Sequence, residues 1–101
     1  MSYAWEKLHL AIHSLAGAGT QQDRLANAGL DLINLQARDF PKELQDDFFN
    51  IKNRMTCVSA QGDEGALVAT VRALDELAIS SLVTNIISLH DAITRRCASY
   101  A

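Results

Sequence analysis

Three residues near the start of the chain have types and a spacing that could bind a metal ion. Glu6, His9 and His13 follow the pattern E-x-x-H-x-x-x-H, and histidines four residues apart on a helix can chelate a metal. The metalloprotease pattern H-E-x-x-H needs a glutamate directly after the first histidine, where this chain has Leu10. A di-iron bundle needs a second E-x-x-H, which His90 does not supply.

The positions of these histidines on the predicted helix also disfavour a metal site. At about 100° per residue, Trp5, Leu8 and Ile12 share the apolar face. His9 lies at the flank of that face and His13 lies further toward the polar side, whereas a metal site in a bundle points inward. We therefore expect solvated or flanking histidines, with no metal and no cofactor.

The remaining polar residues form no catalytic pattern. Asn27, Asp31 and Asn34 make a polar row on an otherwise apolar helix, which we expect to be its solvent edge; a ligand-binding row inside the bundle is the alternative. His90 falls within an apolar stripe, where we expect a hydrogen-bonded histidine at the edge of the core. Cys57 could meet His90 in space, but the spacing does not indicate it. We expect that the protein is not an enzyme.

The composition indicates one globular domain covering residues 1–101. Hydrophobic residues make up 49% of the chain and charged residues 21%, which is ordinary for a folded domain. The net charge of −3 and the absence of long basic runs disfavour nucleic acid as a partner. Cys57 and Cys97 have no disulfide-framework or zinc spacing, which indicates reduced thiols in the cytoplasm. No apolar run approaches the roughly 20 residues that span a bilayer, so we expect no membrane association.

The apolar periodicity predicts an all-α fold: a small antiparallel bundle of four to five helices. No stretch shows sustained apolar/polar alternation, which disfavours strands. The predicted helices run from about 2 to 16, from Thr20 through Leu35, from the segment 38–44 to the residue before 59, from about 64 to 73, and from about 76 to 97. The third helix has an apolar stripe formed by Phe40, Leu44, Phe48, Ile51, Met55 and Val58.

The last third of the chain contains two apolar stripes that do not share a direction. On an ideal helix they are offset by roughly 80°. The first comprises Leu67, Val71 and Leu74, and the second comprises Ile79, Val83, Ile86, His90, Ile93 and Cys97. The offset predicts a bend near Leu74–Asp75, with Asp75 as the N-cap of a new helix and His90 facing the bundle. One continuous helix is the alternative.

Several apolar side chains lie off the predicted buried faces. Phe49 points away from the stripe of its own helix, Leu10 and Tyr3 lie opposite Trp5, and Ile87 and Leu89 flank the stripe of the last helix. Several such residues on a short chain suggest a contact surface. We therefore expect a small non-enzymatic interaction protein that associates with itself as a homodimer, with Phe49, Leu10 and Tyr3 at the interface. The alternative is a small-molecule or metal-binding bundle.

Overall fold

The computed structural model describes residues 2–98 and contains five α-helices and two short 3₁₀ turns within that range. The helices are α1 (Tyr3–Leu15), α2 (Gln21–Leu32), α3 (Gln45–Met55), α4 (Gly62–Ala73) and α5 (Glu76–Ala98), and the 3₁₀ turns span Ala37–Asp39 and Lys42–Leu44. No residue from 2 to 98 lies in a strand, so the predicted small all-α bundle is confirmed.

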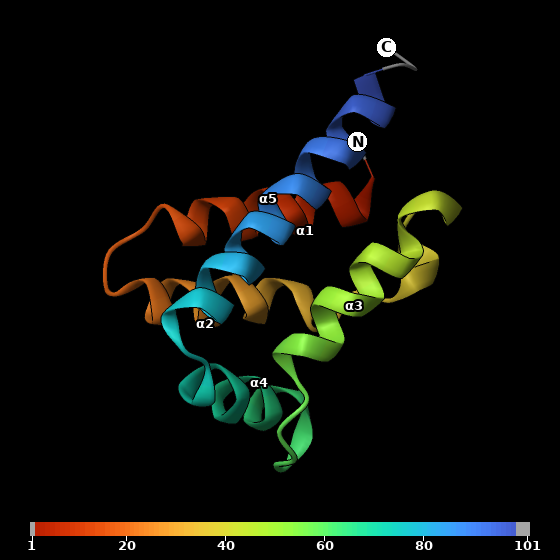
Figure 1. Cartoon of the computed structure of the whole chain (residues 1–101). Helices are drawn as coiled ribbons and strands as arrows, with labels where there is room; N and C mark the ends of the chain where they lie inside the picture. Colours follow the sequence, from red (N-terminus) through yellow and green to blue (C-terminus); the bar gives the residue numbers. More distant parts are fainter. Residues whose placement is uncertain (1, 99–101) are drawn as a thin grey trace.

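Helices α1 and α2 form an antiparallel hairpin, and α5 crosses over it (Figure 1). Each helix of the hairpin begins at a residue whose side-chain hydroxyl caps it. The Ser2 hydroxyl accepts a hydrogen bond from the backbone N–H of Trp5, and Thr20 forms a reciprocal capping box with Asp23. Gly19 has a φ of +99°, a left-handed conformation that glycine adopts without strain, so the connection can turn sharply.

Helix α2 is the central helix and packs against α1, α4 and α5. Its small residues allow this close packing. A Cβ atom added at Gly29 would lie 2.5 Å from a methyl carbon of Leu67 and 2.7 Å from the methyl carbon of Met55. Both of those side chains are fully buried, so glycine at this position lets α3 and α4 approach α2.

Helix α3 begins later than the sequence suggests. Pro41 precedes a 3₁₀ turn, and regular α-helix starts only at Gln45. The predicted stripe is nevertheless buried from Phe40 to Met55, and the rings of Phe40 and Phe48 stack with centroids 4.4 Å apart. Val58 is the exception: it lies beyond the end of the helix and is exposed.

The predicted break between the last two helices is confirmed. Leu74 adopts an extended conformation (ψ 140°) between α4 and α5. A carboxylate oxygen of Asp75 accepts a hydrogen bond of 2.8 Å from the backbone N–H of Ala78, and its carbonyl accepts one from Ile79. Asp75 therefore caps α5, as its side-chain chemistry predicts.

The buried face of α5 is rotated from the predicted stripe. Leu82 and Leu89 are buried in the core, whereas Val83 and His90 are only half-buried. The reason is that α5 packs against α1 along one flank and against α3 along the other. Leu89 was expected to flank the stripe and instead belongs to the core, while Ile87 is exposed as expected. The side chain of Cys97 lies outside the described part.

By length and composition alone, α5 is apolar enough over residues 76–96 to cross a membrane, and it is the one such helix among the described residues. The expectation that no apolar run approaches that length is therefore too strong. Core helices of soluble proteins can have the same length and apolar composition. Only 28% of the apolar 18-residue stretch within this segment is buried, so many of its side chains are partly or fully exposed.

Candidate functional site

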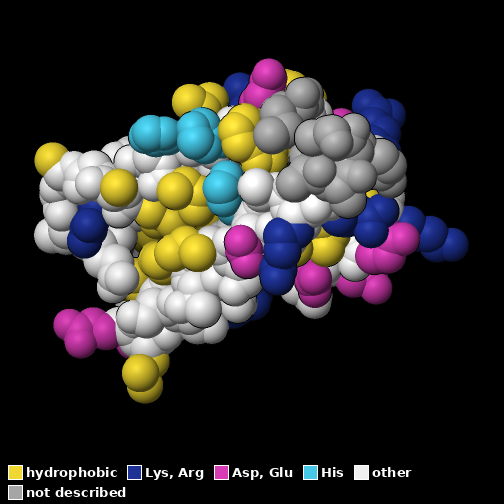
Figure 2. Space-filling model, turned by 90° about the horizontal axis from the view of Figure 1, so that it is seen from above, with side chains coloured by type: hydrophobic (Ala, Val, Ile, Leu, Met, Phe, Trp, Pro, Cys, Tyr) yellow, Lys and Arg dark blue, Asp and Glu magenta, His cyan; other side chains and the backbone are white. Residues whose placement is uncertain are grey.

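All three histidines of the chain lie together where α1 and α5 pack. The rings of His9 and His13 are edge-to-face with centroids 4.7 Å apart, and the His90 ring lies 5.9 Å from that of His9. Figure 2 shows the three histidines close together on one face, beside hydrophobic side chains. We call these three residues the histidine cluster.

Trp5 anchors the histidine cluster. Its indole ring stacks on the ring of His9 with centroids 4.7 Å apart and an angle of 12° between the planes, and it lies 5.9 Å from the ring of His90. The indole N–H donates a hydrogen bond of 2.7 Å to the hydroxyl of Thr94 on α5. Because Trp5, His9 and His13 are spaced four residues apart, successive turns of α1 place them side by side.

The closest polar contact in the cluster joins two imidazoles. The Nε2 atoms of His9 and His13 lie 3.2 Å apart, a distance at which one ring can donate a hydrogen bond to the other. His13 is exposed and His9 is half-buried. The Nδ1 atom of His9 is buried without a hydrogen-bond partner, so the tautomer of this ring depends on what Nε2 contacts.

The surroundings of His90 disfavour its charged form. Burial lowers the pKa of His90, the nearby His9 lowers it further, and Asp91 acts in the opposite direction. The Nε2 atom of His90 is buried and has no hydrogen-bond partner. The expectation that His90 faces the bundle is met by its contacts with Trp5 and His9, but the hydrogen bond expected for it is absent at Nε2.

The metal candidates suggested by sequence are only partly brought together. His9 and His13 meet, but Glu6 is exposed. Among residues 2–98, no three histidine, cysteine, aspartate or glutamate side chains are placed to hold a metal ion jointly. The E-x-x-H-x-x-x-H pattern therefore brings two imidazole rings together, without the glutamate.

The polar row on α2 lies at the solvent edge, in agreement with the favoured interpretation. Asn27 on α2 is exposed, and so is Asn34, which lies in the turn after the end of α2. Asp31 accepts a hydrogen bond of 3.1 Å from the Ser14 hydroxyl on α1. This row stabilises the α1–α2 hairpin through one polar contact.

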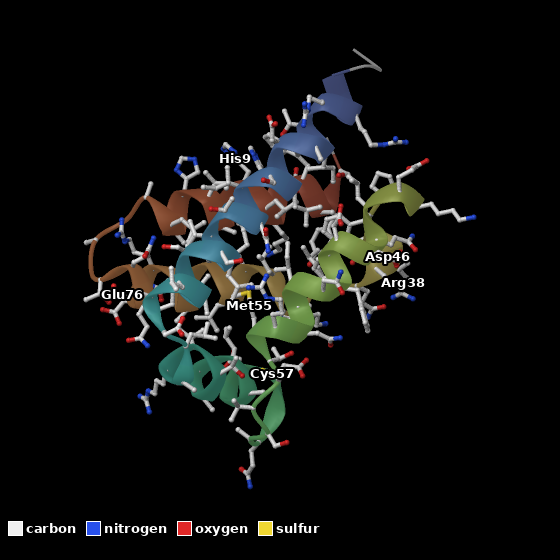
Figure 3. The ribbon with its side chains drawn as sticks, viewed as in Figure 1. His9, Arg38, Asp46, Met55, Cys57 and Glu76 are labelled. Carbon is white, nitrogen blue, oxygen red and sulfur yellow. The ribbon has the colours of Figure 1, made fainter. Side chains whose placement is uncertain are left out.

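Cys57 is far from the histidine cluster. Figure 3 shows His9 toward the α1–α5 end of the molecule and Cys57 toward the α3–α4 end. The Cys57 thiol is free and exposed, and it contacts the carbonyl oxygen of Arg54 at 3.8 Å. A Cys57–His90 catalytic pair is therefore not formed, since His90 packs beside His9.

The predicted interface residues are exposed but lie on two helices. Tyr3 and Leu10 on α1 are 52% and 48% exposed, and Phe49 on α3 is 56% exposed. The main packing partners of α3 are α4 and α5 rather than α1. The sequence did not single out Leu77, which is 83% exposed in the first turn of α5.

A groove of about 340 Å³ runs between α3 and α5. Its lining mixes polar and apolar residues: Asp47, Asn50, Ile51, Arg54, Asn85, Ser88, Leu89 and Ala92. The guanidinium of Arg54 bridges the two helices by donating to the Ser81 hydroxyl at 3.1 Å. At about 100° per residue, these α5 residues and His90 fall on opposite flanks of the buried face, so the groove and the histidine cluster are separate features.

The signals for the histidine cluster were present in the sequence but incomplete. The spacing of Trp5, His9 and His13 places all three along one side of α1. Nothing in the sequence indicates that α5 packs along that side with His90 at the same level. No protein-family model, curated protein or solved structure matches this chain.

Proposed function

We propose that this protein is a small non-enzymatic interaction protein that associates with itself. The observation that carries the proposal is the exposure of Phe49. The opposite side of α3 is buried in the core, where Phe48, Ile51 and Met55 pack. Burying a phenylalanine side chain contributes about 1.5–3 kcal/mol, so an exposed ring on a rigid helix is a ready contact point for a partner.

Other exposed apolar residues support the proposal. Tyr3 and Leu10 lie on the outer side of α1, and Leu77 and Ile87 lie on the outer side of α5. Single exposed apolar residues are normal on soluble proteins. Several of them on a chain of 101 residues favour a protein contact surface.

A second copy of the chain is the partner that we favour. Symmetric dimers are the commonest oligomers, and they place the same surface of each subunit in contact. The net charge of −3 arises from 9 basic and 12 acidic residues, so two copies repel each other only weakly. We also propose a cytoplasmic location, which the free, exposed thiol of Cys57 supports because such thiols persist in reducing compartments.

Sedimentation equilibrium over a range of concentrations tests the proposal. We expect the wild-type protein to sediment as two chains at high concentration and as one chain on dilution. Phe49→Glu should shift the equilibrium toward the single chain, because the interface would then bury an unpaired charge. Leu10→Glu tests the α1 surface in the same way.

The matched control is Asn27→Glu, which adds the same charge at an exposed position on α2. This variant should associate like the wild type. Circular dichroism establishes that each variant remains helical. A wild-type protein that stays a single chain at every concentration would overturn the proposal, and unchanged association of Phe49→Glu would remove Phe49 from the interface.

A further inference from the structure

We propose that His9 and His13 form a surface chelate for a divalent transition-metal ion such as Cu²⁺, Ni²⁺ or Zn²⁺. The two residues lie on successive turns of α1, and their Nε2 atoms are 3.2 Å apart. Two nitrogen ligands at about 2.0–2.1 Å from a tetrahedral Zn²⁺ are separated by about 3.3 Å. The two nitrogens are therefore already spaced to bind one ion between them.

In the absence of metal, the same two nitrogens contact each other. One imidazole donates its Nε2 proton to the Nε2 lone pair of the other, so one proton occupies the space between the two nitrogens. For both Nε2 lone pairs to face a metal ion, the proton of the donor ring moves from its Nε2 to its own Nδ1 by exchange with water, so both rings stay neutral and no proton is lost overall. The ion and the hydrogen bond between the rings therefore compete for the same two lone pairs.

The surrounding structure holds one ligand and leaves the other accessible. The His9 ring is stacked on Trp5, and Trp5 is fixed to α5 by its hydrogen bond to Thr94. The His13 ring is exposed, so an ion can reach the pair from solvent. Holding the His9 ring in place lowers the entropic cost of binding, in the way that hydrogen-bonded neighbours orient the ligands in other metal sites.

The chemistry of the ligands selects the class of metal. Imidazole nitrogens suit Cu²⁺, Ni²⁺ and Zn²⁺, whereas Mg²⁺ and Ca²⁺ prefer oxygen ligands. Because no third side chain among residues 2–98 completes the site, water occupies the remaining coordination positions. The site is therefore open, and its occupancy does not depend on self-association.

The test is calorimetric titration of tag-free protein with Ni²⁺, Zn²⁺ and Cu²⁺, together with electron paramagnetic resonance of the Cu²⁺ complex. We expect one ion per chain, hyperfine splitting from two nitrogens, and a rise in melting temperature with added metal. His13→Gln should abolish this binding without unfolding the protein, because the His13 side chain is exposed. Mg²⁺ should produce no heat of binding.

Two further variants test whether metal binding depends on His9 and His13 alone. Cys57→Ser and His90→Asn should bind metal as the wild type does, because neither side chain belongs to the chelate. No binding by the wild type, or equal binding by His13→Gln, would overturn the proposal. Loss of binding in His90→Asn with retained folding would replace the two-histidine chelate by a site that includes α5, and would also overturn it.

Discussion

The indole N–H of Trp5 donates a hydrogen bond to Oγ1 of Thr94, 89 residues away in the sequence, at a distance of 2.7 Å. This contact joins the beginning of α1 to the last part of α5. It also fixes the ring on which His9 stacks. The link between the two ends of the fold and the geometry of the histidine cluster therefore depend on the same side chain.

The Trp5–Thr94 contact can be measured by a double-mutant cycle. Trp5→Phe removes the donor and keeps an aromatic ring, and Thr94→Val removes the acceptor and keeps the side-chain shape. We expect a coupling energy of about 0.5–1.5 kcal/mol from urea denaturation, the usual contribution of one hydrogen bond. Additive effects of the two substitutions would contradict the contact.

Asp75→Ala should destabilise the protein by about 0.5–2 kcal/mol, because the substitution removes the cap of α5. Asp75→Asn is the matched control, since asparagine caps helices as well as aspartate does, and it should have little effect. Thermal and urea denaturation measure both variants. A neutral or stabilising Asp75→Ala would show that α4 and α5 are one helix in solution, because alanine is the better residue inside a helix.

Gly29→Ala should destabilise the protein even though alanine improves helix propensity by about 1 kcal/mol. The new methyl group would press on Leu67 and Met55, both fully buried, and overpacking of this kind costs about 1–3 kcal/mol. Gly65→Ala on α4 is the control, because its Cβ would lie at an ordinary 3.5 Å from the Cβ of Ala60. We expect Gly65→Ala to be neutral or stabilising in the same denaturation assay.

The lowered pKa of His90 predicts that the free energy of unfolding decreases as the pH decreases. Below the ordinary value of 6.5, the unfolded chain takes up a proton at this residue more readily than the folded chain does. The contribution of His90 is therefore complete above that value and is lost as the pH falls toward the lowered, folded-state pKa. Urea denaturation between about pH 7.5 and pH 5.5, with a chelator present, measures the effect.

His90→Asn should reduce this pH dependence, whatever its effect on stability at neutral pH. An identical pH dependence in wild type and His90→Asn would show that burial beside Trp5 and His9 does not disfavour the protonated His90.

Local features of the chain were predictable where a local interaction decides them. The break at Asp75 follows from the offset between two apolar stripes and from a side chain that caps helices. The exposure of Phe49 follows from its position opposite Phe48, Ile51 and Met55 on one helix. The same reasoning placed the start of α3 too early, because a proline compatible with a first helical turn is also compatible with the 3₁₀ turn found there.

Side-chain periodicity and capping act over a few residues, so the sequence alone specifies that this chain is helical, where its helices change direction and which side of α3 is left exposed. Which flanks of α5 are covered depends instead on tertiary packing, which buries Leu82 and Leu89 and leaves His90 at the edge. It also decided that three histidines meet beside one tryptophan. Those outcomes depend on how α5 is placed against α1 and α3, and that placement is set by the packing of the whole core rather than by any one segment.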